Sequence, residues 1–483
     1  MRKRFFAFAL AAGLGIIASR PLAAQTFTTL YNFSTVAGVY RWSGTNNDGG
    51  VPVATLALSG NSLYGTAAVG GTTANGTVFA VNTDGSGFTN LHNFTGTGDG
   101  SSPYAPLISS GSVLYGTAYY GSSEGGGNGT VFSLNVDGTG FTNLATLGGP
   151  QGLTLSGTNL YVVMAPFPSS GALMKLNTDG TGLTTVYAFT GATENSYYTY
   201  TNSDGDGPLN PVVISGDTLY GTAVNGGLWG NGTVFKVKAD GTRFAVLYTF
   251  STTSGLYDDG TNNDGAVPWG VILSGNTLYG VADRGGRSSN GTVFAVNTDG
   301  TGFAVLHPFP PTFGPNSTNI DGANPAPYLL LSGNTLYGIT QVGGSFSNGT
   351  VYAVNIDGSG FKVLHTFLAT SGPNLTNSDG ASPYGGLIIS GNILYGTTRN
   401  GGTGGSGTIF SISLPPQLAI TASGPNVILT WPTNVAGLTL QSTPSLVVPV
   451  AWTPVSPGPV VVNGLNTVTN PMIGSQHFYR LRQ

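Results

Sequence analysis

The chain has 483 residues, of which only 7% are charged and 11% are aromatic, and its net charge is −4. A nucleic-acid-binding protein needs a basic surface to neutralise phosphate, so this composition excludes that class of partner. The chain has no cysteine, which excludes disulfides, thiolate metal sites and a lipid-modified N-terminal cysteine.

The chain begins with a pattern typical of a secretory signal peptide. Arg2-Lys3-Arg4 is the basic start, Phe5–Ala18 is an apolar run, and Leu22-Ala23-Ala24 is a cleavage site of small residues. The apolar run is short for a transmembrane anchor, and no later segment is long and apolar enough to span a bilayer. We therefore expect residues 1–24 to be removed and the mature protein to be secreted or held at the cell surface, with no membrane span.

The phrase Leu-Tyr-Gly, or a close variant, then recurs seven times at intervals of 46 to 59 residues. We number these copies as repeats 1 to 7 by their tyrosines, which are Tyr64, Tyr115, Tyr161, Tyr220, Tyr279, Tyr337 and Tyr395. A regular internal period indicates one structural unit that is copied and packed on itself.

Each repeat contains four short apolar runs bounded by Gly, Asn and Asp, which predicts four strands. In repeat 1 the expected strands are Val53–Leu58, Ser62–Ala68, Gly76–Asn82 and Phe88–Phe94. The third run is apolar on both faces, as in Val78-Phe79-Ala80-Val81, and a strand of that kind is buried on both sides. Small antiparallel sheets that stack on similar sheets, as in a β-propeller, meet this condition.

The two ends of the repeat array complement each other. Repeat 7 stops after its third run, Gly407–Ile412, and continues into Pro415-Pro416. The mature chain starts with Thr28–Phe33, which matches the fourth run of other repeats, and an open array would leave exposed sheet edges. We therefore expect an all-β fold in which residues 25–414 form a seven-bladed β-propeller closed by the N-terminal strand.

Residues 415–483 drop the repeat and show short alternating runs. These are Leu418–Thr421, Val427–Trp431, Leu438–Gln441, Val460–Val462 and His477–Leu481. The pattern predicts a small β-sandwich, of the fibronectin-III-like or sorting and anchoring kind.

Four spaced elements recur together in the repeats: Asp-Gly-x-x-Pro, Leu-Tyr-Gly, Asn-Gly-Thr-Val-Phe and Asp-Gly. Repeat 5 has all four, at Asp264–Pro268, Leu278–Gly280, Asn290–Phe294 and Asp299-Gly300. This pattern resembles the GloVer (Gloeo/Verruco) tandem-repeat family of secreted bacterial proteins. The resemblance implies an exported protein with a variable C-terminal anchor or sorting region, and it supplies no known reaction and no catalytic residues. Repeat 3 departs from the pattern, because it has Val162 for the glycine and no aspartate before Pro150.

The titratable residues give no sign of a catalytic centre. His92, His307 and His365 occupy one repeat position that Tyr31, Tyr187 and Tyr248 fill elsewhere, which favours a structural role. Most acids lie in the Asp-Gly hairpins or in Asp-Gly-x-x-Pro. A glycosidase needs two carboxylates at a defined distance. Glu194 and Asp258-Asp259, outside the repeat positions, could supply them, but their spacing does not single them out. We expect no catalytic residue.

The Asp-Gly-x-x-Pro loops and the Gly-rich loops should share one face of the propeller. Carboxylate and amide oxygens on one loop can ligate calcium. The calcium candidates are Asp48, Asp204, Asp264, Asp321 and Asp379. The alternative, which we favour, is an Asx-turn in which each aspartate caps its own backbone before glycine, because one loop offers few carboxylates.

Aromatic residues occupy the longest loops of the same face. They are Tyr119, Tyr120, Tyr197, Tyr198, Tyr200, Trp229 and Tyr257. Aromatic rings beside amides suit carbohydrate, but tyrosines also order long loops, and the two roles are equally consistent with the sequence.

The sequence therefore predicts a non-enzymatic binding module for an extracellular polysaccharide or an envelope protein, with no cofactor except for the calcium considered above. One alternative is a polysaccharide-active hydrolase or lyase that uses loop carboxylates. The other is a structural envelope protein.

Overall fold

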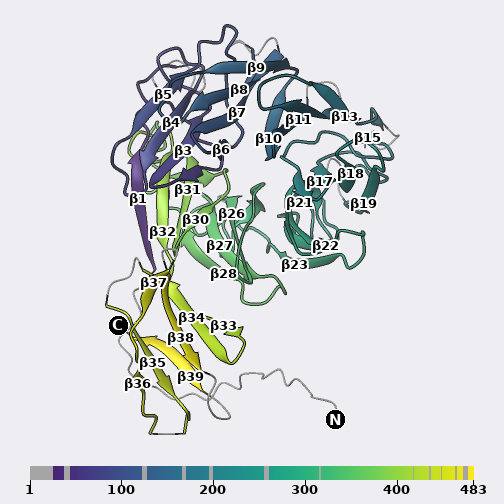
Figure 1. Cartoon of the computed structure of the whole chain (residues 1–483). Coiled ribbons are helices and arrows are strands. Elements are labelled where there is room, and N and C mark those ends of the chain that lie inside the picture. The colour runs from purple at the N-terminus through teal and green to yellow at the C-terminus, as the bar shows by residue number, and fades with distance from the viewer. Residues whose placement is uncertain are drawn as a thin grey trace. The chain divides into compact units, whose positions relative to one another are not determined.

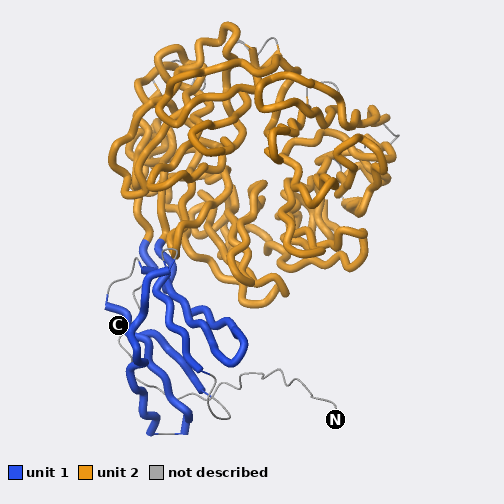
Figure 2. The backbone as a smooth tube through the Cα atoms, viewed as in Figure 1, with its two compact units in different colours: residues 1–26, 413–483 blue, residues 27–412 orange. Residues whose placement is uncertain are grey.

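The computed structural model describes residues 25–36, 44–121, 128–165, 170–194, 200–254, 260–314, 317–416, 418–433, 437–447, 449–462, 465–471 and 477–482. The expected signal peptide, residues 1–24, lies outside them. The chain forms two compact units, Phe27–Ile412 and a smaller one that contains Ser413–Gln483 and the N-terminal residues up to Thr26 (Figure 2). No helix in the described part of the chain is long and apolar enough to cross a membrane.

The fold is all-β, and the described residues form antiparallel sheets with no helix (Figure 1). Seven sheets of four or five described strands lie in the large unit. The sheet of repeat 1 contains β2 (Ala57–Ser59), β3 (Ser62–Ala67), β4 (Thr77–Asn82) and β5 (Thr89–Asn93). The sheet of repeat 2 contains β6 (Ile108–Ser110), β7 (Val113–Tyr120), β8 (Asn128–Asn135) and β9 (Thr142–Leu147). The sheet of repeat 3 contains β10 (Pro150–Ser156), β11 (Asn159–Met164), β12 (Ala172–Asn177) and β13 (Thr184–Ala188).

Repeats 4 to 7 are built in the same way. Repeat 4 has β16 (Val213–Ser215), β17 (Thr218–Ala223), β18 (Thr233–Lys238) and β19 (Ala245–Thr249), preceded by the hairpin β14 (Thr193–Glu194) and β15 (Tyr200–Thr201). Repeat 5 has β20 (Ala266–Ser274), β21 (Thr277–Arg284), β22 (Thr292–Asn297) and β23 (Ala304–Pro308). Repeat 6 has β24 (Ala323–Pro325), β25 (Leu330–Ser332), β26 (Thr335–Val342), β27 (Thr350–Asn355) and β28 (Lys362–Thr366). Repeat 7 has β29 (Ala381–Pro383), β30 (Ile388–Ser390), β31 (Ile393–Asn400) and β32 (Thr408–Ser413), and its remaining strand is the N-terminal β1 (Thr26–Asn32), which pairs with β32.

Three of the four strands expected in repeat 1 agree with the structure to within one residue at each end, and the first does not. We predicted a strand over Val53–Leu58, but β2 covers only Ala57–Ser59. Val53, Ala54 and Leu56 are buried outside the ladder. These residues are apolar because they pack inside the unit. Apolar content alone cannot distinguish a buried segment without strand pairing from a strand.

The glycine of Leu-Tyr-Gly is required by the aromatic residue opposite it. Gly65 pairs with Phe79 across β3 and β4, and a Cβ atom on Gly65 would lie 2.5 Å from the Phe79 Cζ atom. In repeat 3 the paired residues are Val162 and Met174. The thioether chain replaces the rigid ring where the glycine is lost, so the two positions have changed together.

Neighbouring sheets pack face to face through apolar clusters. Tyr64 and Val78 of repeat 1 pack with Phe132 of repeat 2, and similar clusters join repeats 2 and 3, 3 and 4, 4 and 5, and 5 and 6. The rings of Phe367 and Phe410, 5.5 Å apart, join repeat 6 to repeat 7. A further cluster contains residues of repeat 7 and of repeat 1. Because each sheet is covered on both faces, both faces of its inner strands are apolar.

A contact between glycine and proline marks every junction between successive repeats. The proline of Asp-Gly-x-x-Pro, or Pro150 at the same position of repeat 3, lies against the glycine before the third strand of the preceding repeat. A Cβ atom on this glycine would come within 2.4–2.8 Å of the proline Cδ atom. The pairs are Gly76 with Pro103, Gly129 with Pro150, Gly171 with Pro208, Gly232 with Pro268, Gly291 with Pro325, Gly349 with Pro383, and Gly407 with Pro52.

The small unit contains two sheets. One has the order β33 (Ala419–Ser423), β34 (Asn426–Pro432), β38 (Leu465–Pro471) and β37 (Val460–Val462), and the other has the order β36 (Thr453–Pro454), β35 (Thr439–Thr443) and β39 (Phe478–Arg482). Trp431 and Val468 of the first sheet pack with Leu440 and Leu481 of the second. β38 was not predicted, because Asn and Thr make up most of this strand.

Candidate ligand-binding site

The aspartates proposed as calcium ligands hold the chain together between repeats. The Asp48 carboxylate accepts hydrogen bonds from the Tyr31 hydroxyl at 2.9 Å, from the Ser34 amide at 2.9 Å and from the Ser34 hydroxyl. Asp204 and Asp264 bind Tyr187 and Tyr248 in the same way, at 2.9 and 2.8 Å. We call this pairing of a fourth-strand Tyr or His with the aspartate of the next loop the latch.

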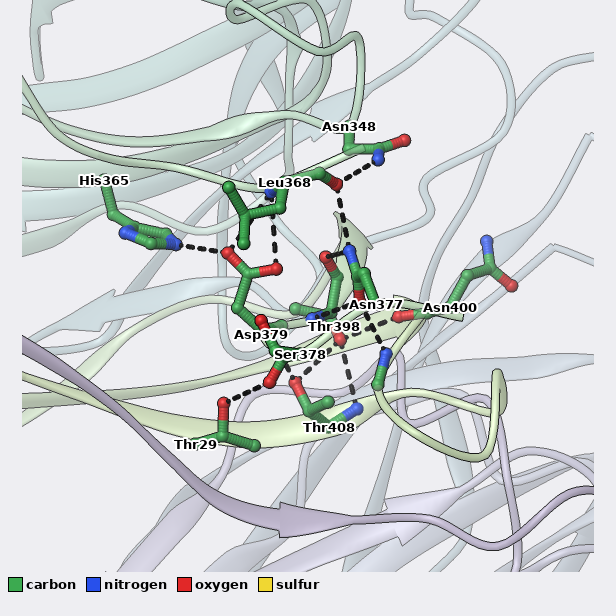
Figure 3. A network of polar contacts seen from close by, with 12 residues as sticks. Thr29, Asn348, His365, Leu368, Asn377, Ser378, Asp379, Thr398, Asn400 and Thr408 are labelled. Carbon is green, nitrogen blue, oxygen red and sulfur yellow. Dashed lines mark hydrogen bonds and ion pairs between the residues drawn. The ribbon is translucent and has the colours of Figure 1, made fainter. Parts of the chain in front are cut away.

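Histidine replaces tyrosine in three latches. His92 Nε2 lies 3.1 Å from Asp99 Oδ2, His307 Nε2 lies 3.1 Å from Asp321 Oδ2, and His365 Nε2 lies 2.9 Å from Asp379 Oδ2. Figure 3 shows the last of these, in which the Leu368 amide also points to the Asp379 carboxylate and the Thr408 hydroxyl donates to the Asp379 carbonyl at 3.2 Å. Tyr and His can interchange at this position because the tyrosine hydroxyl oxygen and the histidine Nε2 atom both lie close to the Oδ2 atom of the latch aspartate.

The Asx-turn expected for these aspartates is wrong in its detail. The asparagine two residues earlier bonds to the loop backbone instead. Asn46 Oδ1 accepts hydrogen bonds from the Gly49 and Gly71 amides, both at 2.9 Å, and Asn46 Nδ2 donates to the Gly49 carbonyl. The bond from the Gly71 amide connects the Asp-Gly-x-x-Pro loop to the Gly-rich loop of the same repeat.

Calcium binding at the five aspartates stays a prediction. At Asp48, Asp204 and Asp264 an ion would have to displace the hydroxyl and amide groups that already donate to the carboxylates. No three His, Cys, Asp or Glu side chains are grouped as metal ligands within the described ranges.

The aromatic residues predicted to bind a ligand fall into three sets. Tyr119 and Tyr120 lie at the end of β7 and not in a loop as predicted, and they line a cavity of about 360 Å³ in the large unit. Tyr200, which lies in β15 and not in a loop, and Trp229 are exposed in repeat 4, where the Asn202 amide donates to the Gly227 carbonyl. Tyr197, Tyr198 and Tyr257 lie outside the described residues, as do Asp258 and Asp259.

The cavity around Tyr119 and Tyr120, which we call the aromatic cavity, receives residues from all seven repeats. Its lining comprises Val53, Tyr104, Tyr119, Tyr120, Gln151, Leu209, Asn210, Trp269, Pro327, Tyr328, Tyr384 and Arg399. Its volume lies in the range of small-molecule sites, roughly 300–1,000 Å³. Tyr119 and Tyr120 were predicted from the sequence as ligand-binding residues, whereas the other four aromatic residues of the lining, Tyr104, Trp269, Tyr328 and Tyr384, were not.

Two repeat positions supply most of the lining. One directly follows the junction proline and holds Val53, Tyr104, Gln151, Leu209, Trp269 and Tyr384 in different repeats. The other lies five residues after the leucine of Leu-Tyr-Gly and holds Tyr119 and Arg399. The sequence does contain one sign of this site. At these two positions the residue type differs from repeat to repeat, whereas the other motif positions keep the same residue.

The cavity combines aromatic faces with buried donors. The Trp269 and Tyr384 rings are perpendicular, with centroids 5.8 Å apart. Asn210 is only 3% exposed, and neither its Nδ2 atom nor the buried Trp269 Nε1 atom has a hydrogen-bond partner among the described residues. An unpaired buried donor costs about 1–3 kcal/mol, so a ligand with acceptor oxygens would gain by reaching these two atoms.

One carboxyl beside the cavity has a perturbed pKa. Asp283 occupies the repeat position of Tyr119 and Arg399 and is 8% exposed. Burial raises the pKa of Asp283 to about 6, although Arg284, whose Nε atom lies 3.6 Å from Asp283 Oδ2, lowers it. Gln341 Nε2 also donates to Asp283 Oδ1 at 3.2 Å. Burial raises the pKa of Tyr384 well above its ordinary value, and the Asp283 charge adds to this rise.

Solved structures share only a distant likeness with the chain. An oligogalacturonate lyase in complex with manganese is 11% identical over 83% of this chain and 99% of its own, with a TM-score of 0.45. TolB from Acinetobacter baumannii is 13% identical over 74% and 78%, with a TM-score of 0.35. A nidogen/laminin complex is 15% identical over 59% and 84%, with a TM-score of 0.35. Such likenesses say nothing about activity.

No curated protein matches the sequence. The Gloeobacter/Verrucomicrobia repeat matches residues 7–199 and 256–427, which are most of the chain. The resemblance seen in the spaced motifs is therefore confirmed, and the chain belongs to the Gloeobacter/Verrucomicrobia repeat family.

Proposed function

We propose that the large unit is a seven-bladed β-propeller closed by β1, and that the exported protein is a non-enzymatic module that binds a saccharide in the aromatic cavity. Two contacts support closure. Gly407 of repeat 7 meets Pro52 of repeat 1 as the glycine and proline of every other junction meet. Phe27 of β1 stacks on His365 at 3.8 Å, which is the role that Phe303 plays for Tyr248.

Export and surface retention are part of the proposal. The N-terminal pattern of residues 1–24 supports export, and the small unit would then serve as the anchor or sorting domain. A protein partner in the cell envelope remains an outcome of the binding test below.

The observation that carries the binding function is the cavity itself. Six aromatic rings from four repeats converge there, and two donors lack hydrogen-bond partners among the described residues. Aromatic faces pack against the C–H faces of sugar rings while donors bind the hydroxyl oxygens. The Asp48, Asp204 and Asp264 carboxylates of the latches, in contrast, already accept internal hydrogen bonds from a tyrosine and from a Ser or Thr, and offer a ligand little.

One observation favours the alternative of a polysaccharide-active enzyme. The raised pKa of Asp283, about 6, is typical of a carboxyl that can act as a general acid. Hydrolysis by the common routes needs a second carboxylate, and the lining contains none. We therefore favour binding without turnover.

The test is retention of the mature chain on a panel of insoluble polysaccharides, with released sugar assayed in the same tubes. We expect retention without release. Trp269→Ala should weaken retention at least about tenfold, a loss typical of a central aromatic anchor. Trp229→Ala is the matched control, because Trp229 is exposed outside the cavity, and it should bind as the wild type does.

Each other outcome contradicts the proposal. Release of sugar that Asp283→Asn abolishes would make the protein an enzyme. Loss of retention in Trp229→Ala but not in Trp269→Ala would move the site to the outer loops. Failure to bind any matrix would favour a protein partner, and self-assembly of the purified chain would favour a structural envelope protein.

A further inference from the structure

The charge of the aromatic cavity narrows the class of saccharide, and this step rests on the proposed function. Arg399 is the one charged residue in the lining. Burial raises the pKa of both Tyr104 and Tyr384, and the positive charge of Arg399 acts against this rise. Arg399 therefore brings a positive charge to the wall of the aromatic cavity.

No Asp or Glu is among the residues that line the aromatic cavity. The buried Asp283 carboxylate contacts Arg284, with Nε and Oδ2 3.6 Å apart, and accepts a hydrogen bond from the Gln341 amide. Asn324 Nδ2 also donates to the Asp283 carbonyl, at 3.0 Å. These three partners of Asp283 lie outside the lining, whereas Arg399 is part of it.

The two unpartnered polar atoms have the same polarity as Arg399. Asn210 Nδ2 and Trp269 Nε1 are both donors, so a ligand must present acceptors to them. A carboxylate is an acceptor-only group, and arginine binds it with two parallel hydrogen bonds. A cationic ligand would meet Arg399 with like charge.

We propose that the aromatic cavity selects a saccharide that carries a carboxylate, a uronic acid residue, with Arg399 binding the carboxylate and with the Asn210 and Trp269 donors binding ring or hydroxyl oxygens. The Trp269 and Tyr384 rings, perpendicular and 5.8 Å apart, supply the apolar surface for the sugar ring. The carboxylate sets the preference between saccharides, and the aromatic rings supply binding that neutral saccharides share.

The test is calorimetric titration of the full mature chain with uronate oligosaccharides and with the same oligosaccharides after reduction of their carboxyl groups. We expect the uronate forms to bind at least about tenfold more tightly than the reduced forms. In Arg399→Gln this preference should vanish, leaving both forms with the affinity of the reduced one. Arg287→Gln removes an equal charge from an exposed position outside the lining, and it should keep the preference.

Two further measurements keep the result interpretable. Arg399→Lys retains the charge but not the paired donors, so its preference should be intermediate. If Arg399→Gln does not fold, salt provides the second test on the wild type, because added salt should weaken uronate binding and leave the reduced forms unchanged. Two further probes test whether a negative charge or a carboxylate alone is sufficient for tight binding. One is a sulfated oligosaccharide, and the other is a small carboxylic acid without a sugar ring. Both should bind more weakly than the uronate oligosaccharide.

The outcomes separate this inference from the proposed function. Equal affinity for uronate and reduced forms would overturn the inference and leave saccharide binding intact, as would a preference that persists in Arg399→Gln. If neither form binds, both the inference and the proposed function fail.

Discussion

At the scale of single residues, the glycine of the Leu-Tyr-Gly motif is explained by the side chains that pack directly against it. A Cβ atom on Gly280 would lie 2.5 Å from the Phe294 Cζ atom and 2.9 Å from the Val271 Cγ1 atom. Phe294 is fully buried. Glycine normally weakens a strand, so its recurrence at this position reflects the aromatic ring that covers it.

Gly280→Ala should therefore destabilise the large unit by about 1–3 kcal/mol, the usual cost of overpacking a core. The measurement is thermal or denaturant unfolding. The matched control is Gly191→Ala, because within the described part of the chain the only atom within 4 Å of its Cβ would be Ser170 Oγ at 3.6 Å. We expect no loss of stability there.

The pair Val162 and Met174 in repeat 3 suggests the rescue. Because the flexible methionine tolerates a side chain opposite it, adding Phe294→Met to Gly280→Ala should cost less than the sum of the two single changes. Strict additivity would show that the ring does not cause the glycine requirement.

At the scale of elements, the latch behaves as a unit that is kept or lost whole. Between repeats 2 and 3 the latch positions hold Ala145 in place of Tyr or His, no aspartate before Pro150, and Leu183 in place of the phenylalanine on which the latch ring stacks. All three members are absent at the same junction. This joint loss is expected if the ring, the aspartate and the stacking phenylalanine stabilise the junction only together. If the aspartates served only as ligands for an ion, the ring and the phenylalanine would not have to be lost with them.

The histidine latches make stability depend on pH in a definite direction. Burial lowers the pKa of His92 below its ordinary value of 6.5, although Asp99 raises it, and burial also lowers the pKa of His307. As the pH falls below about 6.5, the unfolded chain binds protons that the folded chain resists, so stability is present above this pH and is lost as the pH falls.

His92→Tyr should reduce this loss, because Tyr31, Tyr187 and Tyr248 make the same latch with a phenol whose raised pKa keeps it protonated. The measurement is the fall in Tm between about pH 7.5 and about pH 5, which should be smaller in the variant than in the wild type. An unchanged or larger fall would mean that the protonation of His92 does not limit stability.

The strands could be predicted where an apolar run coincides with a hydrogen-bonded strand, and not where burial and strand pairing differ. The ranges of β3, β4 and β5 followed from apolar runs that end in Gly, Asn or Asp. β2 was overextended because Val53 and Leu56 are buried without joining the ladder. β38 was missed because Val468, its only buried residue, is flanked by Thr467 and Thr469 and shares its face with two asparagines.

At the scale of the whole molecule, the sequence predicted the repeated sheets but only a small part of the cavity. Tyr119 and Tyr120 were found because they are adjacent in the sequence, although they lie at the end of β7 and not in the predicted loop. Trp269 and Tyr384 were missed because they are single aromatic residues after a proline, and only the arrangement of the repeats brings them together. A ligand site built from one residue per repeat has no local motif.

The closure of the large unit can be tested with two phenylalanines at the same repeat position. Phe27 stacks on His365 at 3.8 Å and Phe303 stacks on Tyr248 at 3.7 Å. Phe303 lies inside the chain, whereas Phe27 lies in β1, near the start of the described residues. Both keep some exposure, so replacement by alanine should cost less than the about 3–5 kcal/mol of a fully buried phenylalanine.

If β1 closes the propeller, Phe27→Ala should destabilise the large unit by about 1–3 kcal/mol, as much as Phe303→Ala does. Hydrogen exchange should then show added opening in β31 and β32, the strands that β1 completes, and also in β3 and β4, because Phe33 packs there with residues of both repeats 1 and 7. If β1 frays independently of the rest, Phe27→Ala will leave Tm unchanged while Phe303→Ala lowers it. That difference would show that the unit is held by its repeats alone and that the pairing of its two ends adds nothing to its stability.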